Sequence, residues 1–435
     1  MKAFLAFLLI TSAALAQTPP LGNPAISTPT VSGQAATKGY VDNLLSNGNL
    51  PASAINGIST TSTIVTVCAA GCNYTNPLTA WSAARAMLAY GPYVTYTIQI
   101  SDGTYTMSNG FYTEEPTTRA IRIIGNVADS SKVVLNFNNI AGNNGSAFAA
   151  LNGGQIGSAT SPGVDGVTIN GVGAKTSTST WIDQSYGAGA FALGSGSNIH
   201  FGQHVVINNF YYSALADEGG HFASDGGRFN GAGDVNVLAR HGGVVHCLGC
   251  YAVGASHIFT DPQGNSETLG FNFMAEAGGA AYVDGSTGIN AQVACFASQT
   301  AASMWAHDVV AANCLASAVR VSQNGFAELT RAKLRNSAQG VLVQSNGAVS
   351  VDATEIYSNT FDGLHVVGGH AYGNGLRAHD NGSYGIKLEK AASAELYGAL
   401  VGSTANGAGV LFNETGTPCT TLNGACNPPS FLVIN

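Results

Sequence analysis

Residues 340–412 repeat one short pattern four times, in which a glycine is followed by three mostly apolar residues. The copies are Gly340-Val341-Leu342-Val343, Gly363-Leu364-His365-Val366, Gly385-Ile386-Lys387-Leu388 and Gly409-Val410-Leu411-Phe412. Their glycines are 23, 22 and 24 residues apart. A second marker, a glycine or other short residue just before a strand-like segment, gives the same period over more of the chain. It occurs at Gly196, Gly220, Gly243, Gly279, Ala302, Gly325, Gly347, His370 and Ser393.

This period predicts the fold class. Repeats of 22 to 24 residues that contain only short strands and turns are typical of an all-β parallel β-helix, with one repeat per coil. Leucine-rich repeats have a similar length but need leucines in fixed register, which this chain lacks. One interval, from Gly243 to Gly279, is 36 residues long. It predicts an insertion around residues 256–270.

Composition supports this fold and excludes others. Of the 435 residues only 9% are charged, whereas 45% are hydrophobic and 56 are glycine. Coiled coils and long solvated helices need many more Glu and Lys residues. A net charge of -8 also argues against a phosphate-binding surface, because nucleic-acid binding depends on clustered Lys and Arg.

The N-terminus has the three parts of a secretory signal. Lys2 is followed by an apolar run from Phe4 to Ile10 and by Ala14-Leu15-Ala16, so that residues 1–16 predict a signal peptide. The run is too short to span a membrane, and we expect a secreted, periplasmic or cell-surface protein. An uncleaved hydrophobic N-terminus or a misassigned start codon is the alternative.

The remaining chain divides into two parts. Residues 17–58 are rich in Pro, Gly, Ser, Thr and Asn and are predicted to be a linker, with a short helix from Ala36 to Leu45. Residues 59–435 form the predicted β-helix domain. Thr79–Ala89 is predicted to be an amphipathic helix that caps the open end of the coils, with Trp81, Ala84, Met87 and Leu88 on its apolar face.

The eight cysteines fall in local pairs that fit disulfides in an oxidising compartment, although sequence does not fix their connectivity. The pairs are Cys68/Cys72, Cys247/Cys250, Cys295/Cys314 and Cys419/Cys426. The spacing of Cys247 and Cys250 also suits zinc, but no second such pair follows at zinc-finger distance.

Two resemblances add to this interpretation. From about Ile64 to its end the chain resembles the pectate-lyase-like superfamily of right-handed parallel β-helices, which includes polysaccharide lyases, glycoside hydrolases and phage tailspikes. Residues 34–42 (Gln-Ala-Ala-Thr-Lys-Gly-Tyr-Val-Asp) resemble a short element of bacteriophage tail fibres. The second resemblance implies a homotrimer that binds a glycan. It conflicts with the signal peptide, so either the leader is spurious or an exported protein carries a tail-type linker.

A weaker resemblance concerns metal binding. Trp181-Ile182-Asp183-Gln184 is similar to the Trp-Ile-Asp-His stretch of pectate lyases, in which the Asp helps to bind calcium. The resemblance implies a possible Ca²⁺ ligand at Asp183, and no other cofactor is expected. Gln184 stands where those lyases have His, and a turn role for Asp183 is the alternative. The chain has neither the Asp-Asp pair nor the Gly-His-Gly of polygalacturonases, so a familiar pectinase is disfavoured.

Candidate catalytic residues come from the coil register. When Gly219, Gly242 and Gly278 are aligned, the position two residues earlier is charged on three successive coils: it is Asp217, Arg240 and Glu276. The next position holds Glu218 on the first of these coils and His241 on the second. Two carboxylates about 5 to 10 Å apart are what glycosidic cleavage needs. An acidic residue of this column would then be acid or base, the arginine would neutralise substrate charge, and the histidine would orient them. The candidates are Asp217, Glu218, Arg240, His241 and Glu276.

The alternative is that these charges neutralise one another at the coil corners. Asp261 and Glu267 in the insertion would overhang the column, and Phe210, Tyr211 and Tyr212 are candidates for stacking on sugar rings or for a core role. Histidines such as His257, His307 and His379 do not show metal-ligand spacing and are interpreted as solvated turn residues.

Three hypotheses about function follow. The first is a carbohydrate-recognising protein of tail-fibre or tailspike type, possibly homotrimeric, which binds a cell-surface glycan. The second is a secreted polysaccharide lyase or glycoside hydrolase. The third is a non-catalytic exported adhesin.

Overall fold

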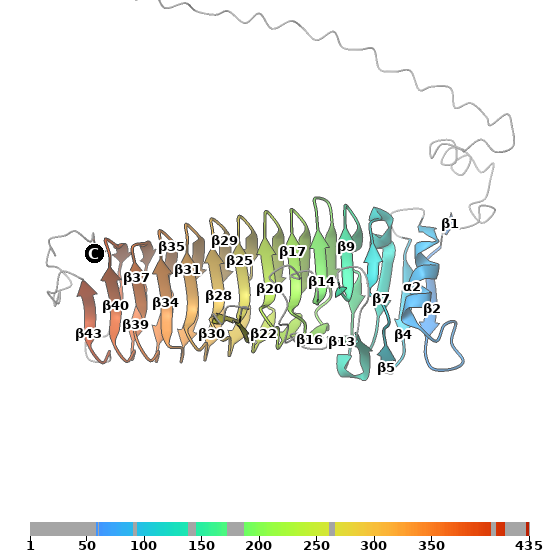
Figure 1. Ribbon diagram of the computed structural model, residues 1–435, viewed down its shortest axis with the longest axis horizontal. Coiled ribbons are helices and arrows are strands. Elements are labelled where there is room, and N and C mark those ends of the chain that lie inside the picture. Colours follow the sequence, from blue (N-terminus) through green and yellow to red (C-terminus); the bar gives the residue numbers. More distant parts are fainter. Residues whose placement is uncertain are drawn as a thin grey trace, which may run out of the picture.

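The computed structural model describes residues 61–89, 94–137, 145–171, 187–260, 266–401 and 406–413, with strands at 58–59 and 432–434. Figure 1 shows one elongated stack of coils, with α2 (Pro77–Arg85) at its N-terminal end. Each complete coil supplies one strand to each of three sheets, in which coil neighbours pair in parallel. The predicted all-β parallel β-helix is therefore confirmed.

The three large sheets are numbered 1 to 3. Sheet 1 has 16 strands: β2 (Thr63–Val67), β4 (Tyr96–Ile100), β7 (Ile121–Ile124), β10 (Gln155–Ser158), β11 (Ser161–Pro162), β12 (Val164–Asp165), β15 (Asn198–Phe201), β18 (His221–Asp225), β21 (Val244–Leu248), β26 (Ala280–Tyr282), β29 (Ser303–His307), β32 (Phe326–Thr330), β35 (Ala348–Asp352), β38 (His370–Asn374), β41 (Ser393–Tyr397) and β44 (Leu432–Ile434).

Sheets 2 and 3 have 12 strands each. Sheet 2 contains β5 (Gly103–Thr106), β8 (Val133–Asn136), β13 (Thr168–Asn170), β16 (Val206–Asn208), β19 (Arg228–Asn230), β22 (Tyr251–Val253), β27 (Thr287–Ile289), β30 (Val310–Ala312), β33 (Lys333–Arg335), β36 (Glu355–Tyr357), β39 (Arg377–His379) and β42 (Leu400–Val401). Sheet 3 contains β6 (Phe111–Thr113), β9 (Phe148–Leu151), β14 (Ala188–Leu193), β17 (Tyr212–Asp217), β20 (Val235–Arg240), β25 (Phe271–Glu276), β28 (Ala294–Gln299), β31 (Ser317–Ser322), β34 (Gln339–Gln344), β37 (Leu364–Val367), β40 (Tyr384–Glu389) and β43 (Gly409–Asn413).

The markers that precede the strands of sheet 1 lie at the turn from sheet 3, whereas the glycines of the four-residue pattern lie in, or just before, strands of sheet 3. Glu218 and Gly219 adopt left-handed φ values of 50° and 81°, which reverse the chain between β17 and β18. A side chain is excluded at the next position, because a Cβ on Gly220 would lie 2.2 Å from the carbonyl oxygen of Ala192 on the preceding coil. This contact explains why a small residue recurs there.

The register of three markers was wrong by one residue. The position just before each sheet 1 strand is held by Ser197, Gly369 and Ala392 rather than by Gly196, His370 and Ser393. His370 and Ser393 are instead the first residues of β38 and β41. A small residue next to a turn glycine made the two positions indistinguishable in sequence.

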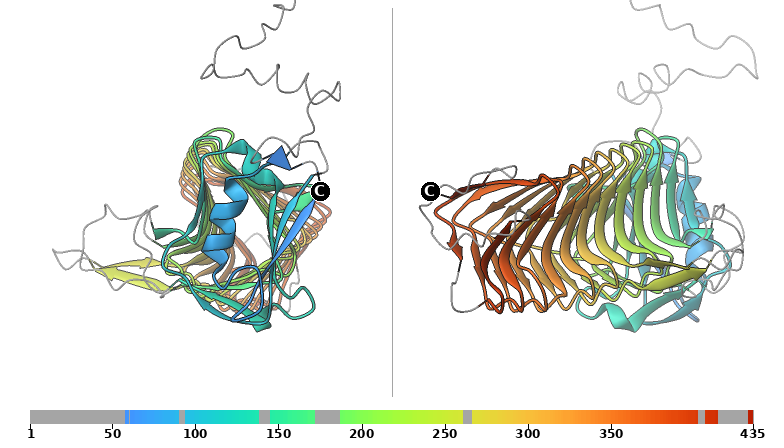
Figure 2. Two further views of the ribbon diagram at one scale, coloured as in Figure 1. Left: turned by 90° about the vertical axis from the view of Figure 1, so that its right-hand side faces the viewer. Right: turned by 60° about the vertical axis from the view of Figure 1, so that its left-hand side comes forward.

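The cap helix α2 is shorter than predicted. It begins after Asn76, whose side chain accepts a hydrogen bond from the Leu78 N–H at 2.8 Å, and it ends at Arg85. Trp81 and Ala84 are buried as expected, and helix α2 lies across the N-terminal end of the coils (Figure 2). Leu88 is not helical, because β3 (Leu88–Ala89) pairs with β1 (Ile58–Ser59). Short 3-10 helices span Pro116–Ala120 and Ser130–Lys132. No helix in the described ranges could cross a membrane.

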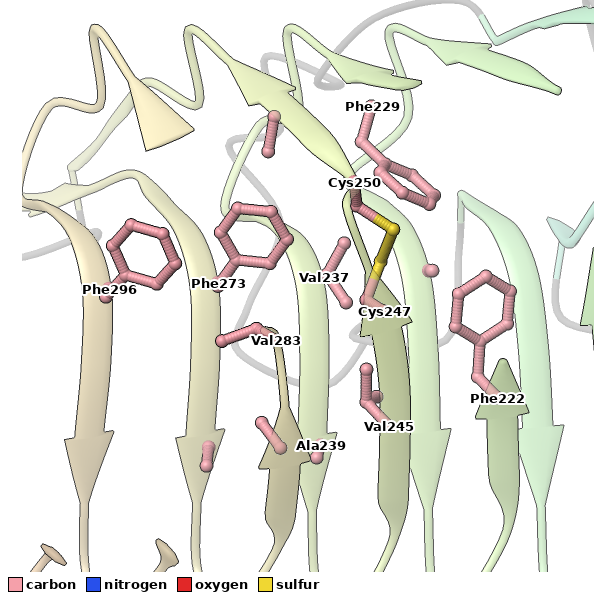
Figure 3. Packing of buried hydrophobic residues seen from close by; sticks show 14 of the residues in the cluster. Phe222, Phe229, Val237, Ala239, Val245, Cys247, Cys250, Phe273, Val283 and Phe296 are labelled. Atoms are coloured by element: carbon pink, nitrogen blue, oxygen red, sulfur yellow. A yellow bond between two sulfur atoms is a disulfide. The ribbon is translucent and has the colours of Figure 1, made fainter. Parts of the chain in front are cut away.

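The interior of the coils is filled by stacked apolar side chains (Figure 3). Phe273 and Phe296 on neighbouring strands of sheet 3 stack with ring centroids 5.0 Å apart. Disulfides join Cys247 to Cys250 and Cys295 to Cys314 inside this core, and Cys68 to Cys72 near the cap. These three predicted pairs are confirmed, whereas Cys419 and Cys426 lie outside the described residues.

Buried asparagine side chains form a ladder of hydrogen bonds along the core. Asn359, Asn381 and Asn406 lie at the same turn on successive coils, and each side-chain amide donates to the next at 2.9 and 3.1 Å. Asn359 also accepts from the backbone N–H of Ser337 at 3.0 Å. The ladder satisfies turn groups that water cannot reach.

The predicted insertion is a β-hairpin. Strands β23 (His257–Thr260) and β24 (Ser266–Leu269) pair antiparallel between β22 and β25, and the hairpin projects from the coil stack (Figure 2). Asp261, the N-terminal segments 1–16 and 34–42, and the stretch Trp181–Gln184 lie outside the described residues.

Candidate functional site

The charged column predicted from sequence is assembled as expected. Asp217 ends β17, Arg240 ends β20 and Glu276 ends β25, and Arg240 and Glu276 are register partners. Arg240 donates from Nε and Nη2 to Oδ2 of Asp217, both at 2.8 Å. The register that placed these three side chains together is therefore correct.

The geometry of Asp217 is that of a structural ion pair. Its Oδ1 atom lies 2.9 Å from Nδ1 of His241 and accepts from the backbone N–H of Glu218 at 2.9 Å, while Oδ2 is occupied by Arg240. The side chains of Asp217 and Arg240 are only 6% and 11% exposed. Burial opposes the charge of Arg240, but the hydrogen bond to Asp217 and the charges of Tyr212, Asp217 and Glu276 together outweigh it and raise the pKa of the guanidinium above its usual value. Both oxygens are thus already engaged within the protein.

The other members of this column lie around the pair. Oε2 of Glu276 accepts from Nε2 of Gln299 on the next coil at 3.2 Å. Glu218 and His241 occupy the exposed turn between sheets 3 and 1. Of the three candidate stacking aromatics, Phe210 and Tyr212 are buried, and burial raises the pKa of the Tyr212 phenol well above its usual value. These two rings have a packing role.

A different feature, on the outer face of sheet 1, was not predicted. Five rings on five consecutive strands follow one another along the stack, and we call them the ring row: His200, His221, His246, Tyr282 and Trp305. Successive ring centroids are 5.4, 5.1, 4.5 and 4.4 Å apart. Tyr282 and Trp305 are stacked with nearly parallel rings, at an interplanar angle of 6°. All five side chains are half-buried, so part of each ring faces solvent.

The histidines of the ring row carry little charge. Burial, followed by the neighbouring imidazoles, lowers the pKa of His221 to about 4. Burial also lowers the pKa of His200 and of His246, against the pull of nearby carboxylates such as Asp225. At pH 7 the three imidazoles are therefore neutral, and the row presents uncharged flat rings.

Three carboxylates and one histidine lie on the coils around and beyond Trp305, and we call this group the acidic end: Asp284, His307, Glu328 and Asp352. Glu328 is the register partner of Trp305 on the next coil. His307 lies between two carboxylates, with Nδ1 3.3 Å from Oδ1 of Asp284 and Nε2 3.1 Å from Oε1 of Glu328. The three side chains are 30% to 41% exposed. Titratable groups thus meet at a surface that solvent reaches.

Asp352 and Tyr372 close this group on the far side. Asp352 accepts from the hydroxyl of Ser350 at 3.2 Å and from the backbone N–H of Asn374 at 2.7 Å. Tyr372 is 37% exposed, and its pKa is raised by burial and then by the charges of Glu328 and Asp352. An exposed aromatic ring therefore lies beyond the carboxylates, as Trp305 does before them.

The interpretation of His307 and His379 as turn residues was wrong. Both lie on strands, β29 and β39, and His257 of the same prediction likewise begins strand β23. His379 lies between Asp380 at 2.7 Å and Glu355 at 3.3 Å. No group of three or more His, Cys, Asp or Glu in the described ranges has the arrangement of a metal site.

The repeat itself carried a signal for the ring row. His246, Tyr282, Trp305 and Glu328 each lie three residues after the small residue that precedes their strand. A search of that register for aromatic as well as charged residues would have identified these members of the row but not His221, which lies one residue after Gly220.

Comparisons with known proteins support the fold. A family model described as "Right handed beta helix region" matches residues 317–423. The catalytic domain of a GH87 α-1,3-glucanase in complex with tetrasaccharides is 12% identical over 86% of this chain and 68% of that chain, with a TM-score of 0.51. An alginate lyase from Paenibacillus sp. (12% identity, 81% of this chain, 98% of that one) and the pectate lyase Pel9A (14%, 86% and 87%) give TM-scores of 0.39 and 0.34. No curated protein matches the sequence. The family model and the likeness to the glucanase support the right-handed parallel β-helix, and at 12% identity that likeness shows the fold alone.

Proposed function

We propose that the protein binds an extended polysaccharide along the outer face of sheet 1, over the ring row and the acidic end. The observation that carries the proposal is the stacked pair Tyr282 and Trp305, whose rings continue a row of half-buried rings on successive coils. These two rings cover each other's faces, so a sugar on this surface would contact ring edges, which carry partial positive charge and can face sugar oxygens. Coils repeat about every 4.8 Å, a step similar in length to one sugar unit of an extended chain.

The site also supplies polar partners. Partly exposed carboxylates at the acidic end, Asp284 and Glu328, can accept hydrogen bonds from sugar hydroxyl groups. A site with flat apolar rings beside a few directed polar groups is the usual composition of a small-molecule or glycan site. The fold alone would not distinguish binding from other functions.

Substitution of the central rings tests this proposal. We expect Trp305→Ala and Tyr282→Ala each to weaken glycan binding about tenfold or more, measured by affinity electrophoresis and calorimetry against a panel of bacterial and plant polysaccharides. Phe361→Ala is the matched control, because Phe361 is 54% exposed but lies in the turn between sheets 2 and 3. Equal binding by all three variants and the parent chain would place the glycan elsewhere.

A second candidate function is glycoside hydrolysis at the acidic end. The supporting observation is that two partly exposed carboxylates, Asp284 and Glu328, flank the His307 ring at 3.3 and 3.1 Å, which brings candidate acids and bases together at the surface. One carboxylic acid would protonate the leaving glycosidic oxygen, while the other carboxylate would activate water to attack the anomeric carbon. Lyase chemistry, or catalysis by Asp217, Glu218, Arg240, His241 and Glu276, stays a prediction.

Activity and binding can be separated experimentally. We expect Glu328→Gln to abolish the release of reducing ends from a bound polysaccharide while the amide retains the glycan within about threefold of the parent affinity. If the parent chain binds a polymer but releases no reducing ends from it, hydrolysis is excluded for that polymer and the adhesin or tail-fibre hypothesis gains.

Export and oligomeric state are two further proposals. We propose that the protein is exported, and its disulfides fit an oxidising compartment. The tail-fibre hypothesis predicts a homotrimer, which size-exclusion chromatography with light scattering would detect. A monomer would count against that hypothesis without affecting glycan binding on sheet 1.

A further inference from the structure

We infer that the polysaccharide bound on sheet 1 is a neutral one, an inference that rests on the proposed function and specifies its ligand. In sheet 1, the eight strands that follow one another from β18 to β41 contain neither Lys nor Arg. The same strands carry Asp225, Glu328, Asp352 and Glu395, and Asp284 follows directly after β26. A glycan that follows this face therefore meets only negative formal charges on the strands.

The histidines do not reverse this balance. His200, His221 and His246 are neutral at pH 7, because burial disfavours their charged forms. His307 lies between Asp284 and Glu328, so a proton on its ring would be offset by two carboxylates. The ring row thus consists of uncharged rings and lacks the cations that uronate or sulfate groups require.

The cations at the margins of sheet 1 are already engaged. Arg331, in the turn after β32, donates from Nε and Nη2 to the two oxygens of Asp308 at 2.7 and 2.6 Å. Lys390, in the turn before β41, also has an interaction within the protein. Neither is placed on the strands that the ring row follows.

Sheet 3 shows the contrast, and it explains why the sequence pointed to an acidic sugar. Arg240 is the cation that was expected to neutralise substrate charge, but its guanidinium is 11% exposed and is bound by Asp217. Lys387 on β40 donates to Glu389 at 2.8 Å. These cations compensate carboxylates of the protein itself, so they do not form an open anion site.

Hydroxyl groups suit the carboxylates of sheet 1 better than further charges do. An ionised carboxylate only accepts hydrogen bonds, and sugar hydroxyls are donors. A uronate chain would instead place one negative charge on each unit opposite Asp225, Glu328 or Asp352. Such like charges repel, and the repulsion is screened by salt.

Matched polymers test the inference. The full chain is titrated with neutral polysaccharides and with carboxymethylated derivatives of the same backbones, and also with alginate and pectate, at low and at high salt. We expect the carboxymethylated member of each pair to bind at least tenfold more weakly at low salt, and the gap to narrow as salt rises. The double variant Glu328→Gln/Asp352→Asn should reduce the difference in affinity between the neutral and the carboxymethylated polymer at low salt. The single variant Asp225→Asn, which lies outside the acidic end, should reduce the same difference.

The possible failures are distinguishable. If an acidic polymer binds as tightly as its neutral partner and Trp305→Ala weakens that binding, the neutral-ligand inference is wrong while the proposed function stands. If no polymer of either set is retained, the proposed function itself fails, and the inference falls with it.

Discussion

Replacement of Asp217 tests whether the predicted charged column is structural. In Asp217→Ala the Arg240 guanidinium keeps its place at the end of β20, 5.7 Å from the Tyr212 ring, but loses the carboxylate that accepts its Nε and Nη2 hydrogen bonds. The arginine is 11% exposed, so water can replace only part of what is lost.

The magnitude follows from that burial. Removal of one partner of a buried ion pair costs about 3–5 kcal/mol, because the other charge is left uncompensated. If the coils unfold as one unit, the entropy of unfolding of a domain this large converts that loss into a fall in Tm of about 4–6 °C. Arg240 keeps a further interaction and the charge of Glu276 nearby, so we expect the loss for Asp217→Ala to lie near the lower end of this range.

Two further variants make the measurement specific. Asp217→Leu/Arg240→Met should recover most of the loss, because Leu193 is the register partner of Asp217 on the preceding coil and a leucine extends an apolar column. Asp308→Ala breaks an ion pair of the same coil-to-coil kind, but its partners are 54% and 59% exposed, and we expect a loss close to the error of measurement.

Urea denaturation followed by circular dichroism, together with calorimetry, would measure all three variants. The structural interpretation is refuted if Asp217→Ala costs no more than Asp308→Ala, or if the apolar double variant is as unstable as the single one. Loss of glycan processing in a stable double variant would support the catalytic role that the sequence suggested for this pair.

Two other predictions concern the ring row and the amide ladder. Because the folded pKa of His221 is about 4 and an unfolded histidine titrates near 6.5, the unfolded state binds more protons below pH 6.5. Stability should therefore be greatest above that pH and fall by about 3 kcal/mol toward pH 4. His221→Gln should flatten that slope in urea titrations at each pH, and an unchanged slope would assign it to the carboxylates. Asn359→Ala should cost about 2–3 kcal/mol by urea denaturation, because it leaves the buried Ser337 N–H without its acceptor, whereas Asn374→Ala at an exposed position should cost far less. Equal losses would mean that the ladder adds no stability.

The repeat determined most of the fold. A period of 22 to 24 residues reflects a local event, the left-handed turn at residues such as Glu218 and Gly219, followed by a position too close to the preceding coil for a large side chain. Both constraints act on residue identity at fixed positions, so they are visible in one sequence. They sufficed to place Asp217, Arg240 and Glu276 on one column and to locate the inserted hairpin.

Local spacing also predicted the disulfides of Cys68, Cys247 and Cys295 with their neighbours in sequence. The end of α2 was not predictable in this way. The apolar phase continues to Leu88, but that residue pairs with Ile58 in β1, and only the tertiary structure sets this competition between helix and strand.

What the sequence left open is which side chains face solvent and which are already satisfied. Asp217 and Glu328 are both carboxylates at strand positions of the repeat, yet one is buried against Arg240 and the other lies partly exposed beside His307. Likewise Tyr212 is buried while Tyr282 stacks on Trp305 at the surface. The period records how each coil turns, because turns are local. Burial and partners depend on the packing of neighbouring coils, and this packing decides where a ligand can bind.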